Sequence, residues 1–553
     1  MSERERHPED LRNAERSVHV CLLTTYLFES IGLRQLCSVL QARGHRCTLI
    51  FVKEFQWGEF RPITSQEREV LISLLRRLRP DLVGIGLTSS FVADLSYDLA
   101  DMIRRQVGAP VILGGFHPSV CPEEALEHAD FVCRGEGEEA LADLADALAR
   151  GRATDAIANI WTTVDGEIRK NEVRPLRDDL DSLPFPAFAS ADTFLIEADN
   201  LWELDPATRI PRYHTYASRM ACPFNCSFCG GPWLRRELYA GKGNPRRYRS
   251  VGTILAEIKQ ARESHPKIEI VQFWDEVFAV RPPEGWLDEF CDCFPREIGL
   301  PFAIWSHPAV VTEATIGRLR EAGLKGVVLG VESGSQRVRR EVLNRRETDA
   351  AVLRAAEILH RHNLEVGWDF IVDIPWLTEE NCRGTFELIM RLPRPFDLGM
   401  HSMSFLPGAA ITERALAEGK ISPAQVSRAD QPLPERFEEM RWKYRLSARD
   451  RSSAYWHSMI YLAGMSFVPR SLLWHLYRLA PLLKLCPKPL TVAAEAARIK
   501  QQTGELKPHA ALAAVYPGVA GALARHPNLG RLISSTARGL AKLVARASSG
   551  LRR

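Results

Sequence analysis

The chain has 553 residues, with 72 Lys and Arg against 69 Asp and Glu, and a formal net charge of +3. This length exceeds one ordinary hydrophobic core, so we expect about three domains. The small net charge gives no reason to expect a nucleic-acid-binding protein, and 12 cysteines in so long a chain do not suggest a disulfide framework. The charged N-terminus lacks the apolar segment of a secretory signal, and no run of about 18 apolar residues occurs, which predicts a cytoplasmic protein.

Residues 1–160 alternate short apolar runs with amphipathic stretches of helical period. The apolar runs predict buried parallel strands, and the stretches between them predict helices. Such alternation favours an α/β domain with an open parallel sheet of the flavodoxin or Rossmann type. The predicted strands cover residues 18–23, 47–52, 82–87, 110–115 and 131–133.

Small and polar residues follow these predicted strands. Ligands of open parallel sheets bind at the carboxyl ends of the strands, where glycine lets a bulky ligand approach the backbone. Glycine after a strand is also ordinary turn chemistry, so the pattern alone leaves both a ligand site and plain turns open. The candidate ligand residues are Thr24, Thr25, Thr88, Ser89, Gly114, Gly115, His117, Arg134, Gly135 and Glu136.

Residues 161–209 are predicted to link this domain to the next one. A short hairpin-like pattern near 160–168 is followed by the proline-rich stretch 183–188. Prolines at that density favour an extended segment. We assign no chemistry to this linker.

Three cysteines, Cys222, Cys226 and Cys229, lie within eight residues with the spacing CxxxCxxC. Three thiolates on one tight loop can hold three irons of a cubane iron–sulfur cluster, which leaves the fourth iron open to a small molecule. A structural zinc site requires four ligands, and the next cysteines, Cys291 and Cys293, do not form a second pair at zinc-ribbon spacing.

Residues 210–425 repeat the alternation of strands and helices six times, which predicts a partial parallel (β/α)6 barrel. In such barrels the chemistry lies at the carboxyl ends of the strands. Polar residues follow two of these strands, Asp275 and Glu276 after one and Glu332 and Ser333 after the other. The predicted strands cover residues 213–218, 268–273, 302–305, 327–331, 368–372 and 401–405.

The cysteine spacing, with Phe228 just before the third cysteine, resembles the signature of the radical S-adenosylmethionine (SAM) enzymes. The resemblance implies a [4Fe–4S] cluster on the three cysteines and SAM at the open iron. It implies SAM contacts from Phe228, Asp275, Glu276, Glu332 and Ser333. The two acids at 275–276 and the serine are also suited to capping helices, so that alternative stays open.

Two phrases, GGFHPSVCPEEAL at 114–126 and CRGEGEEAL at 133–141, resemble the cobalamin-binding domain that precedes the radical core in one class of radical SAM enzymes. The resemblance implies that cobalamin binds at the strand ends given above. The chain lacks the Asp-x-His-x-x-Gly motif with which other cobalamin enzymes bind the cobalt, so it implies a cobalamin not held by that histidine. His117 has two open interpretations, contact with cobalt and capping of the loop before Pro118.

Residues 426–553 are predicted to form a helical C-terminal region. From 431 onwards the sequence contains 20 Lys and Arg against six Asp and Glu. Basic amphipathic helices with aromatic residues can lie on a membrane surface or contact an acidic carrier protein. A basic face that is merely solvated is the alternative.

The resemblance implies a cobalamin-dependent radical SAM C-methyltransferase. Such an enzyme forms a 5′-deoxyadenosyl radical and transfers methyl from methylcobalamin to an unactivated carbon, here of a specialised metabolite. A cyclase or rearrangement enzyme of the same class is one alternative, and a non-catalytic cobalamin or iron–sulfur sensor is another. The expected partners are a small or carrier-bound substrate and an electron donor such as flavodoxin or ferredoxin, without nucleic acid.

Overall fold

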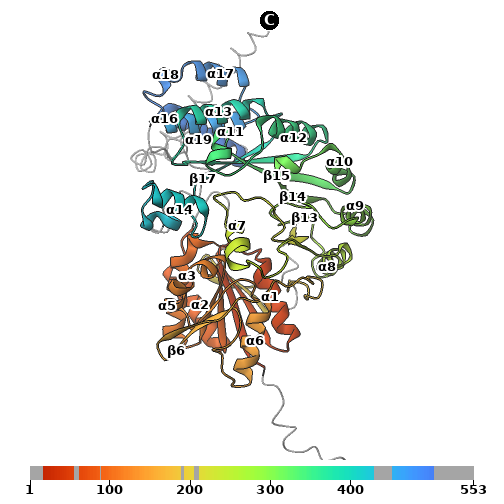
Figure 1. The fold of residues 1–553 in the computed structure, drawn as a ribbon, viewed down its shortest axis with the longest axis vertical. Helices are drawn as coiled ribbons and strands as arrows, with labels where there is room; N and C mark the ends of the chain where they lie inside the picture. Colours follow the sequence, from red (N-terminus) through yellow and green to blue (C-terminus); the bar gives the residue numbers. More distant parts are fainter. Residues whose placement is uncertain are drawn as a thin grey trace, which may run out of the picture. The chain divides into compact units, whose positions relative to one another are not determined.

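The computed structural model describes residues 17–54, 61–87, 89–188, 192–204, 211–428 and 451–503. Thr88 and parts of the predicted C-terminal region, 429–450 and 504–553, lie outside the described residues. The chain divides into two compact units, each described by itself (Figure 1). The first unit contains residues up to 305 together with 318–325 and 404–436, and the second contains 306–317, 326–403 and the chain from 437.

The first unit begins with a nine-stranded sheet in the order β7-β6-β5-β4-β3-β1-β2-β8-β9. Its centre is parallel, because β1 pairs with both β2 and β3, and β4 lies between β3 and β5. These strands carry mostly buried apolar residues, as the continuous apolar runs predicted. They are β1 (His19–Thr25), β2 (Arg46–Val52), β3 (Leu82–Leu87), β4 (Val111–Gly115) and β5 (Phe131–Cys133).

Four further strands come from the stretch that the sequence predicted as a linker. One pair forms the hairpin β6–β7, and β8 pairs in parallel with β2. The stretch therefore belongs to the N-terminal sheet rather than only crossing between domains. The strands are β6 (Ile160–Val164), β7 (Glu167–Lys170), β8 (Asp192–Glu197) and β9 (Asn200–Glu203).

Helices follow the parallel strands, and their ends agree with local capping chemistry. The Ser30 side chain accepts a hydrogen bond from the third residue of α1, and Thr64 forms a capping box with Glu67 at the start of α2. The helices of this part are α1 (Ile31–Ala42), α2 (Ser65–Leu78), α3 (Ala93–Gln106), α4 (Phe116–Val120), α5 (Pro122–His128) and α6 (Glu138–Ala149).

The proline-rich segment packs along α1, whose side chains donate hydrogen bonds to the backbone carbonyl oxygens of the segment. Arg34 is fully buried and donates to the carbonyl oxygens of Phe28 (3.3 Å) and Ala187 (3.2 Å). Gln35 donates to the carbonyl oxygen of Pro184 at 2.6 Å. These bonds satisfy carbonyls that proline-rich, extended backbone leaves without partners, and they fix the segment on the helix.

The first unit continues with three parallel strands of the predicted barrel, β10 (Arg212–Thr215), β13 (Ile270–Phe273) and β14 (Phe302–Ser306). A short antiparallel pair, β11 (Ser218–Arg219) and β12 (Arg247–Tyr248), precedes β13 in the sequence. Aromatic rings of β13, β14 and α9 form a buried cluster around Phe290. The helices are α7 (Gly231–Trp233), α8 (Val251–Ser264), α9 (Trp286–Glu297) and α14 (Ala410–Ala417).

The second unit contains the other three parallel strands, β15 (Leu324–Glu332), β16 (Glu365–Val372) and β17 (Asp397–Ser402). The described part of the predicted C-terminal region is helical, so the α/β fold class with a helical C-terminal region is confirmed. Among the described residues, no helix is long and apolar enough to span a lipid bilayer. The remaining helices are α10 (Glu313–Glu321), α11 (Gln336–Glu341), α12 (Asp349–Arg361), α13 (Glu379–Arg391), α16 (Arg451–Gly464), α17 (Arg470–Arg478), α18 (Ala480–Leu483) and α19 (Lys488–Thr503).

Replacing Phe290 by alanine tests the aromatic core of the first unit. Phe290 is fully buried, and its ring lies within 5.6 Å, centroid to centroid, of the rings of Phe273 and Phe278. Because the cavity left behind cannot collapse, we expect about 3–5 kcal/mol of lost stability and a lower melting temperature by circular dichroism. Ile168→Ala, on the exposed strand β7, is the control and should shift the melting temperature little. Equal shifts in the two variants would contradict this account of the core.

Candidate functional site

The cysteine loop, residues 222–229, follows β11 and is held in a compact turn by its own backbone. The Cys229 N–H donates to the Cys226 carbonyl oxygen at 3.3 Å, and the Gly231 N–H donates to the Cys229 sulfur at 3.4 Å. The Arg235 guanidinium closes the loop by donating to the carbonyl oxygen of Phe224 at 2.6 Å. Cys226 is buried, Cys222 is half-buried and Cys229 is exposed. Three thiols on one such turn suit a cluster of iron and sulfur.

Phe116, at the end of β4, packs directly against the cysteine loop. A Cβ atom at Gly230, the residue after Cys229, would lie 2.3 Å from the Phe116 ring. No side chain larger than hydrogen fits there without a shift of that ring. The Phe116 ring also packs edge-to-face with Trp233, with 6.5 Å between centroids. The glycine phrase of the N-terminal sheet and the cysteine loop therefore meet in one place within the first unit.

Asp275 fixes the backbone that leads into the cysteine loop. Its carboxylate accepts hydrogen bonds from the backbone N–H groups of Ala217 (2.9 Å) and Ser218 (2.7 Å), and from the Ser218 hydroxyl. Asp275 is buried, and burial raises its pKa to about 7, although the three donors act in the opposite direction. The structure therefore gives Asp275 a positioning role toward the loop.

Glu276, which directly follows Asp275, lies beyond the end of β13 at a bend of the chain. Its side chain is exposed and lines a cavity of about 680 Å³ in the first unit. Glycines from β3, β4 and the β5–α6 loop form one wall, and residues around β11 and the end of β13 form another. The lining includes Glu29, Gly32, Leu33, Gly84, Gly86, Gly114, Gly115, Phe116, Gly135, Glu136, Gly137, Glu138, Tyr216, Arg219, Met220, Tyr239, Trp274 and Glu276.

Four of the residues predicted from the strand ends line this cavity, namely Gly114, Gly115, Gly135 and Glu136. Gly135 has a left-handed backbone (φ +80°), and a Cβ atom there would lie 2.2 Å from the Tyr239 hydroxyl oxygen. The absence of a side chain lets Tyr239 accept a hydrogen bond from the Glu136 N–H at 2.7 Å. This contact joins the β5–α6 loop to the segment that follows the cysteines.

The other predicted ligand residues of this sheet are not among the described residues that line the cavity. Thr24 is buried and donates to the Gly86 carbonyl oxygen at 3.0 Å, and Thr25 is buried in β1. Ser89 caps the short turn that follows it. Arg134 donates to the Ser119 carbonyl oxygen at 3.2 Å and lies over the Trp161 ring.

His117 is buried beside α3, where its Nε2 lies 2.9 Å from the Tyr97 hydroxyl oxygen. The same nitrogen lies 3.8 Å from the Glu124 carboxylate. The structure therefore places the ring in a polar contact with α3 and α5. It does not place the ring in the wall of the cavity.

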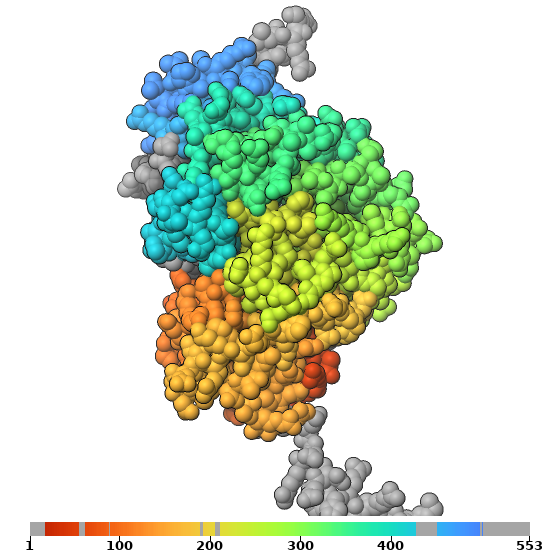
Figure 2. Space-filling model, viewed as in Figure 1, coloured from red at the N-terminus to blue at the C-terminus, as the bar shows by residue number. Residues whose placement is uncertain are grey.

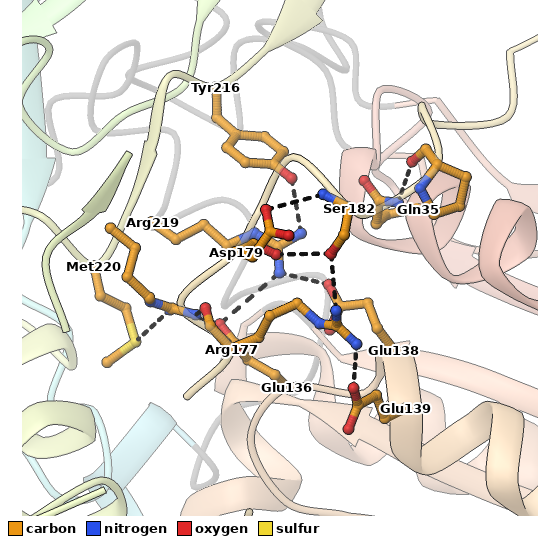
Figure 3. Close-up of polar contacts among 12 residues, drawn as sticks. Gln35, Glu136, Glu138, Glu139, Arg177, Asp179, Ser182, Tyr216, Arg219 and Met220 are labelled. Atoms are coloured by element: carbon orange, nitrogen blue, oxygen red, sulfur yellow. Dashed lines mark hydrogen bonds and ion pairs between the residues drawn. The ribbon is translucent and has the colours of Figure 1, made fainter. Parts of the chain in front are cut away.

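A chain of ion pairs joins the floor of the cavity to the strand that leads into the cysteine loop (Figure 3). Arg219 donates to the Glu138 carboxylate at 2.5 Å and to the Tyr216 hydroxyl at 2.9 Å. Arg247 binds both carboxylate oxygens of Glu136, at 3.0 and 2.7 Å. Burial acts to raise the pKa of Glu138, but the charge of Arg219 and its hydrogen bond hold that pKa below the ordinary value.

Glu332 and Ser333 lie in the second unit, at the end of β15. Glu332 has a left-handed backbone (φ +68°), and its carboxylate accepts a hydrogen bond from Arg345 at 3.3 Å. Burial raises the pKa of Glu332 to about 7. Ser333 is buried, and its hydroxyl accepts a hydrogen bond from the Ser335 N–H at 3.2 Å. Phe228, in contrast, lies half-buried on the cysteine loop itself.

Two family models match the chain. The B12 binding domain matches residues 20–145, and the radical SAM superfamily matches residues 220–389, so together they cover more than half of the chain. The chain is a radical SAM enzyme that carries a B12 binding domain. The B12 match covers the glycine wall of the cavity, and the radical SAM match covers the cysteine loop.

Several relatives of this radical SAM enzyme are named as methyltransferases. It is 25% identical over 356 residues to an uncharacterized methyltransferase of Pyrococcus horikoshii, which covers 64% of this chain and 72% of that protein. It is 28% identical to the bacteriochlorophyllide d C-8(2)-methyltransferase of Chlorobaculum tepidum, over 46% of this chain and 50% of that one. An anaerobic magnesium-protoporphyrin IX monomethyl ester cyclase of Rubrivivax gelatinosus is 25% identical, over 56% and 54%.

Solved structures share the fold. The radical SAM methyltransferase TsrM from Kitasatospora setae, solved with cobalamin and a [4Fe–4S] cluster, gives a TM-score of 0.58 at 16% identity, over 74% of this chain and 76% of that chain. The cobalamin-dependent radical SAM enzyme OxsB, solved with aqua-cobalamin, gives 0.60 at 16% identity, over 91% and 76%.

Sequence reasoning did not single out several residues of the cavity wall. Arg219, Tyr216 and Trp274 adjoin predicted features, but no pattern shows which way their side chains point. The start of α1, with Gly32 and Leu33, also lines the cavity. A glycine, Gly32, at the beginning of the helix after the first strand was the sequence feature that could have predicted this part of the wall.

Glu138→Gln tests the ion pair under the cavity. The change leaves the guanidinium of Arg219, largely buried, without its carboxylate, so we expect a loss of about 3 kcal/mol in stability and a clearly lower melting temperature. Glu139→Gln is a matched control, because the neighbouring carboxylate pairs with Arg177 in a more exposed position and should contribute less than about 1 kcal/mol. A melting temperature lowered equally by both variants would show that the buried pair contributes no more to stability than the exposed pair.

The raised pKa of Asp275 predicts a dependence of stability on pH. The folded protein keeps the Asp275 proton up to about pH 7, whereas the unfolded chain loses it near its ordinary pKa of about 4. The folded state therefore binds more protons in this range, and its stability falls as the pH rises from about 4 to about 7. Asp275→Asn should flatten that fall in chemical denaturation at several pH values. An unchanged pH dependence would refute the assignment.

Proposed function

We propose that this radical SAM enzyme is a cobalamin-dependent C-methyltransferase that acts on an unactivated carbon of a specialised metabolite. The observation that carries the proposal is the contact of Phe116 with Gly230. It sets the end of the cysteine loop against Phe116, which lines the same cavity of the first unit as the strand ends of the B12 binding domain. The methyltransferases among the relatives support the same reaction class.

The cysteine loop is the proposed site of a [4Fe–4S] cluster, on Cys222, Cys226 and Cys229. When bound, the cluster with SAM supplies a 5′-deoxyadenosyl radical, and cobalamin supplies the methyl group. Arg235 holds the loop in its turn, and Asp275 fixes the backbone before it. Phe228, Glu276, Glu332 and Ser333 are the proposed contacts to SAM, and Asp275 acts on the site through Ser218.

The cavity suits cobalamin because its walls are mainly apolar and glycine-rich, with a few acids. Gly32 lines the cavity with nothing within 4 Å of the place that a Cβ atom would take, which leaves room for a large ring, and the carboxylates of Glu29 and Glu276 can accept hydrogen bonds from its amide side chains. Glu136 is already bound by Arg247 and shapes the floor. We propose that the cobalt has no ligand from His117, since the His117 ring contacts Tyr97 outside the cavity wall.

A ring-forming or rearranging radical reaction is the second candidate. It is supported by the likeness to the anaerobic magnesium-protoporphyrin IX monomethyl ester cyclases of Rubrivivax gelatinosus and Synechocystis. The non-catalytic sensor considered from the sequence is not carried forward, because the chain is a radical SAM enzyme. We also propose a cytoplasmic enzyme that takes a small or carrier-bound substrate and an electron from flavodoxin or ferredoxin.

Cys226→Ala tests the cluster assignment. After anaerobic reconstitution with iron and sulfide, the wild-type chain should show iron–sulfur absorbance and, with dithionite and SAM, release 5′-deoxyadenosine. The variant should lose both signals, because the two remaining thiolates are too few to bind a cubane cluster, which takes three thiolates and leaves the fourth iron open. Cys291→Ala removes a buried thiol in α9 instead and should keep both. A Cys226→Ala chain that still forms 5′-deoxyadenosine would refute the assignment.

Labelled SAM separates the two candidate reactions. With a deuterated methyl group on SAM, and lysate metabolites as the substrate pool, methyl transfer predicts a product that carries the label. Formation of 5′-deoxyadenosine with a new product but without label would favour cyclisation or rearrangement. No cleavage of SAM by the reconstituted wild type would overturn both.

A further inference from the structure

The second unit exposes apolar side chains on the helices α17 and α18. Among the described residues, eight large hydrophobic side chains are exposed, and four of these lie within the twelve residues 474–485. Trp474 is 40% exposed, Leu479 is 48%, Leu482 is 66% and Leu485 is 67%. Isolated exposed apolar residues are normal on soluble proteins, but a concentration of this kind marks an interaction surface.

The opposite side of α17 packs against the rest of the second unit, so the exposed side of the helix faces outward from that unit. Leu473 is fully buried, and the Tyr477 ring stacks on the Phe386 ring of α13 at 5.6 Å. The Tyr455 hydroxyl of α16 donates to the Leu476 carbonyl oxygen at 3.1 Å. Within this unit α17 and α18 form the outermost layer over α13 and α16 (Figures 1 and 2). The helices are therefore fixed on the unit, and their exposed leucines project from it.

The same segment is purely basic. Residues 470–488 contain four Lys and Arg and no Asp or Glu. Two of the four turn inward, since Arg470 donates to the Leu392 carbonyl oxygen and Lys484 pairs with Glu379. Arg478 and Lys488 are exposed. The outer side thus presents leucines beside exposed basic side chains.

We propose that this surface, formed by Trp474, Arg478, Leu479, Leu482 and Leu485, docks on an anionic lipid membrane. A lipid interface meets both properties at once, because the acyl-chain boundary takes leucines while the headgroup phosphates take basic side chains. The two leucines at 482 and 485 protrude by two-thirds of their surface and do not line a groove, which suits insertion into an interface. The sequence beyond 503 adds eight Lys and Arg and one Glu, which strengthens the attraction to negative charge.

Docking here uses none of the cysteines or proposed SAM contacts, so it stands apart from the proposed reaction. It predicts an enzyme that works at a membrane surface, where an apolar substrate is concentrated. A second copy of the chain is the other occupant that such a surface could take, and the test separates the two.

The experiment is cosedimentation of the full chain with sucrose-loaded vesicles. Vesicles of phosphatidylcholine mixed with phosphatidylglycerol should bind the wild type, and vesicles of phosphatidylcholine alone should bind it much less. The double change Leu482→Glu and Leu485→Glu should weaken binding to the mixed vesicles by at least about tenfold, because it removes the inserted apolar area and adds repulsion. Arg478→Glu should weaken binding mainly at low salt.

The matched control is the double change Ile168→Glu and Trp202→Glu, which adds the same charge at exposed apolar positions of the first unit. It should bind the mixed vesicles like the wild type, and all variants should keep the wild-type melting temperature. No binding of the wild type to the mixed vesicles would overturn the proposal, as would equal weakening in the control. If the wild type does not bind vesicles but is a dimer by light scattering, and the double leucine variant is a monomer, the surface belongs to a second copy of the chain instead.

Discussion

The contact between Phe116 and Gly230 joins the two halves of the first unit at the point where the cofactors are proposed to meet. Phe116 follows the glycine pair at the end of β4, and Gly230 follows the last cysteine of the loop. At 2.3 Å from the ring, even a methyl group at position 230 would force the Phe116 ring to shift. The packing of Phe116 against the end of the cysteine loop therefore depends on a position without a side chain.

Two polar contacts hold the same arrangement from other sides. Arg219 ties the strand before the loop to Glu138 at the start of α6, and Asp275 binds the backbone of Ala217 and Ser218. All three contacts link segments far apart in the sequence, and each includes a residue that lines the cavity. The three contacts differ in what they require. The aromatic contact requires only close packing, whereas each buried carboxylate requires its hydrogen-bond partners to offset the free energy of desolvation.

Much of this architecture was predictable from local pattern. The five parallel strands, the three-cysteine loop and the glycines of the cavity wall follow from apolar runs, spacing and strand ends, which are properties of neighbouring residues. The roles of Asp275 and Glu276 were not separable in that way. Both follow β13, but Asp275 is buried on the backbone of Ala217 and Ser218 whereas Glu276 lines the cavity, and no local pattern distinguishes the two.

Long-range partners were also beyond the sequence pattern. His117 occupies a position typical of a ligand, yet its ring contacts Tyr97, twenty residues earlier and on another helix. The pairing of Glu138 with Arg219 joins residues 81 positions apart, and each alone looks like an ordinary surface charge. The proline-rich stretch was predicted to be a linker because its prolines leave it without a strand or helix pattern of its own. Its carbonyl oxygens are bound instead by side chains of α1, and no local pattern reveals these partners.

The central claim is that cobalamin in the cavity and an iron–sulfur cluster on the adjoining cysteine loop lie close together in the first unit, and electron paramagnetic resonance tests it most directly. The wild-type chain would be reconstituted with cluster and cobalamin, then reduced until both carry an unpaired electron. Our account predicts mutual broadening of the two signals, since a cluster on the cysteine loop and a cobalamin in the cavity beside Phe116 are close enough to couple. Signals identical to those of samples holding one cofactor each, at full occupancy of both, would contradict it.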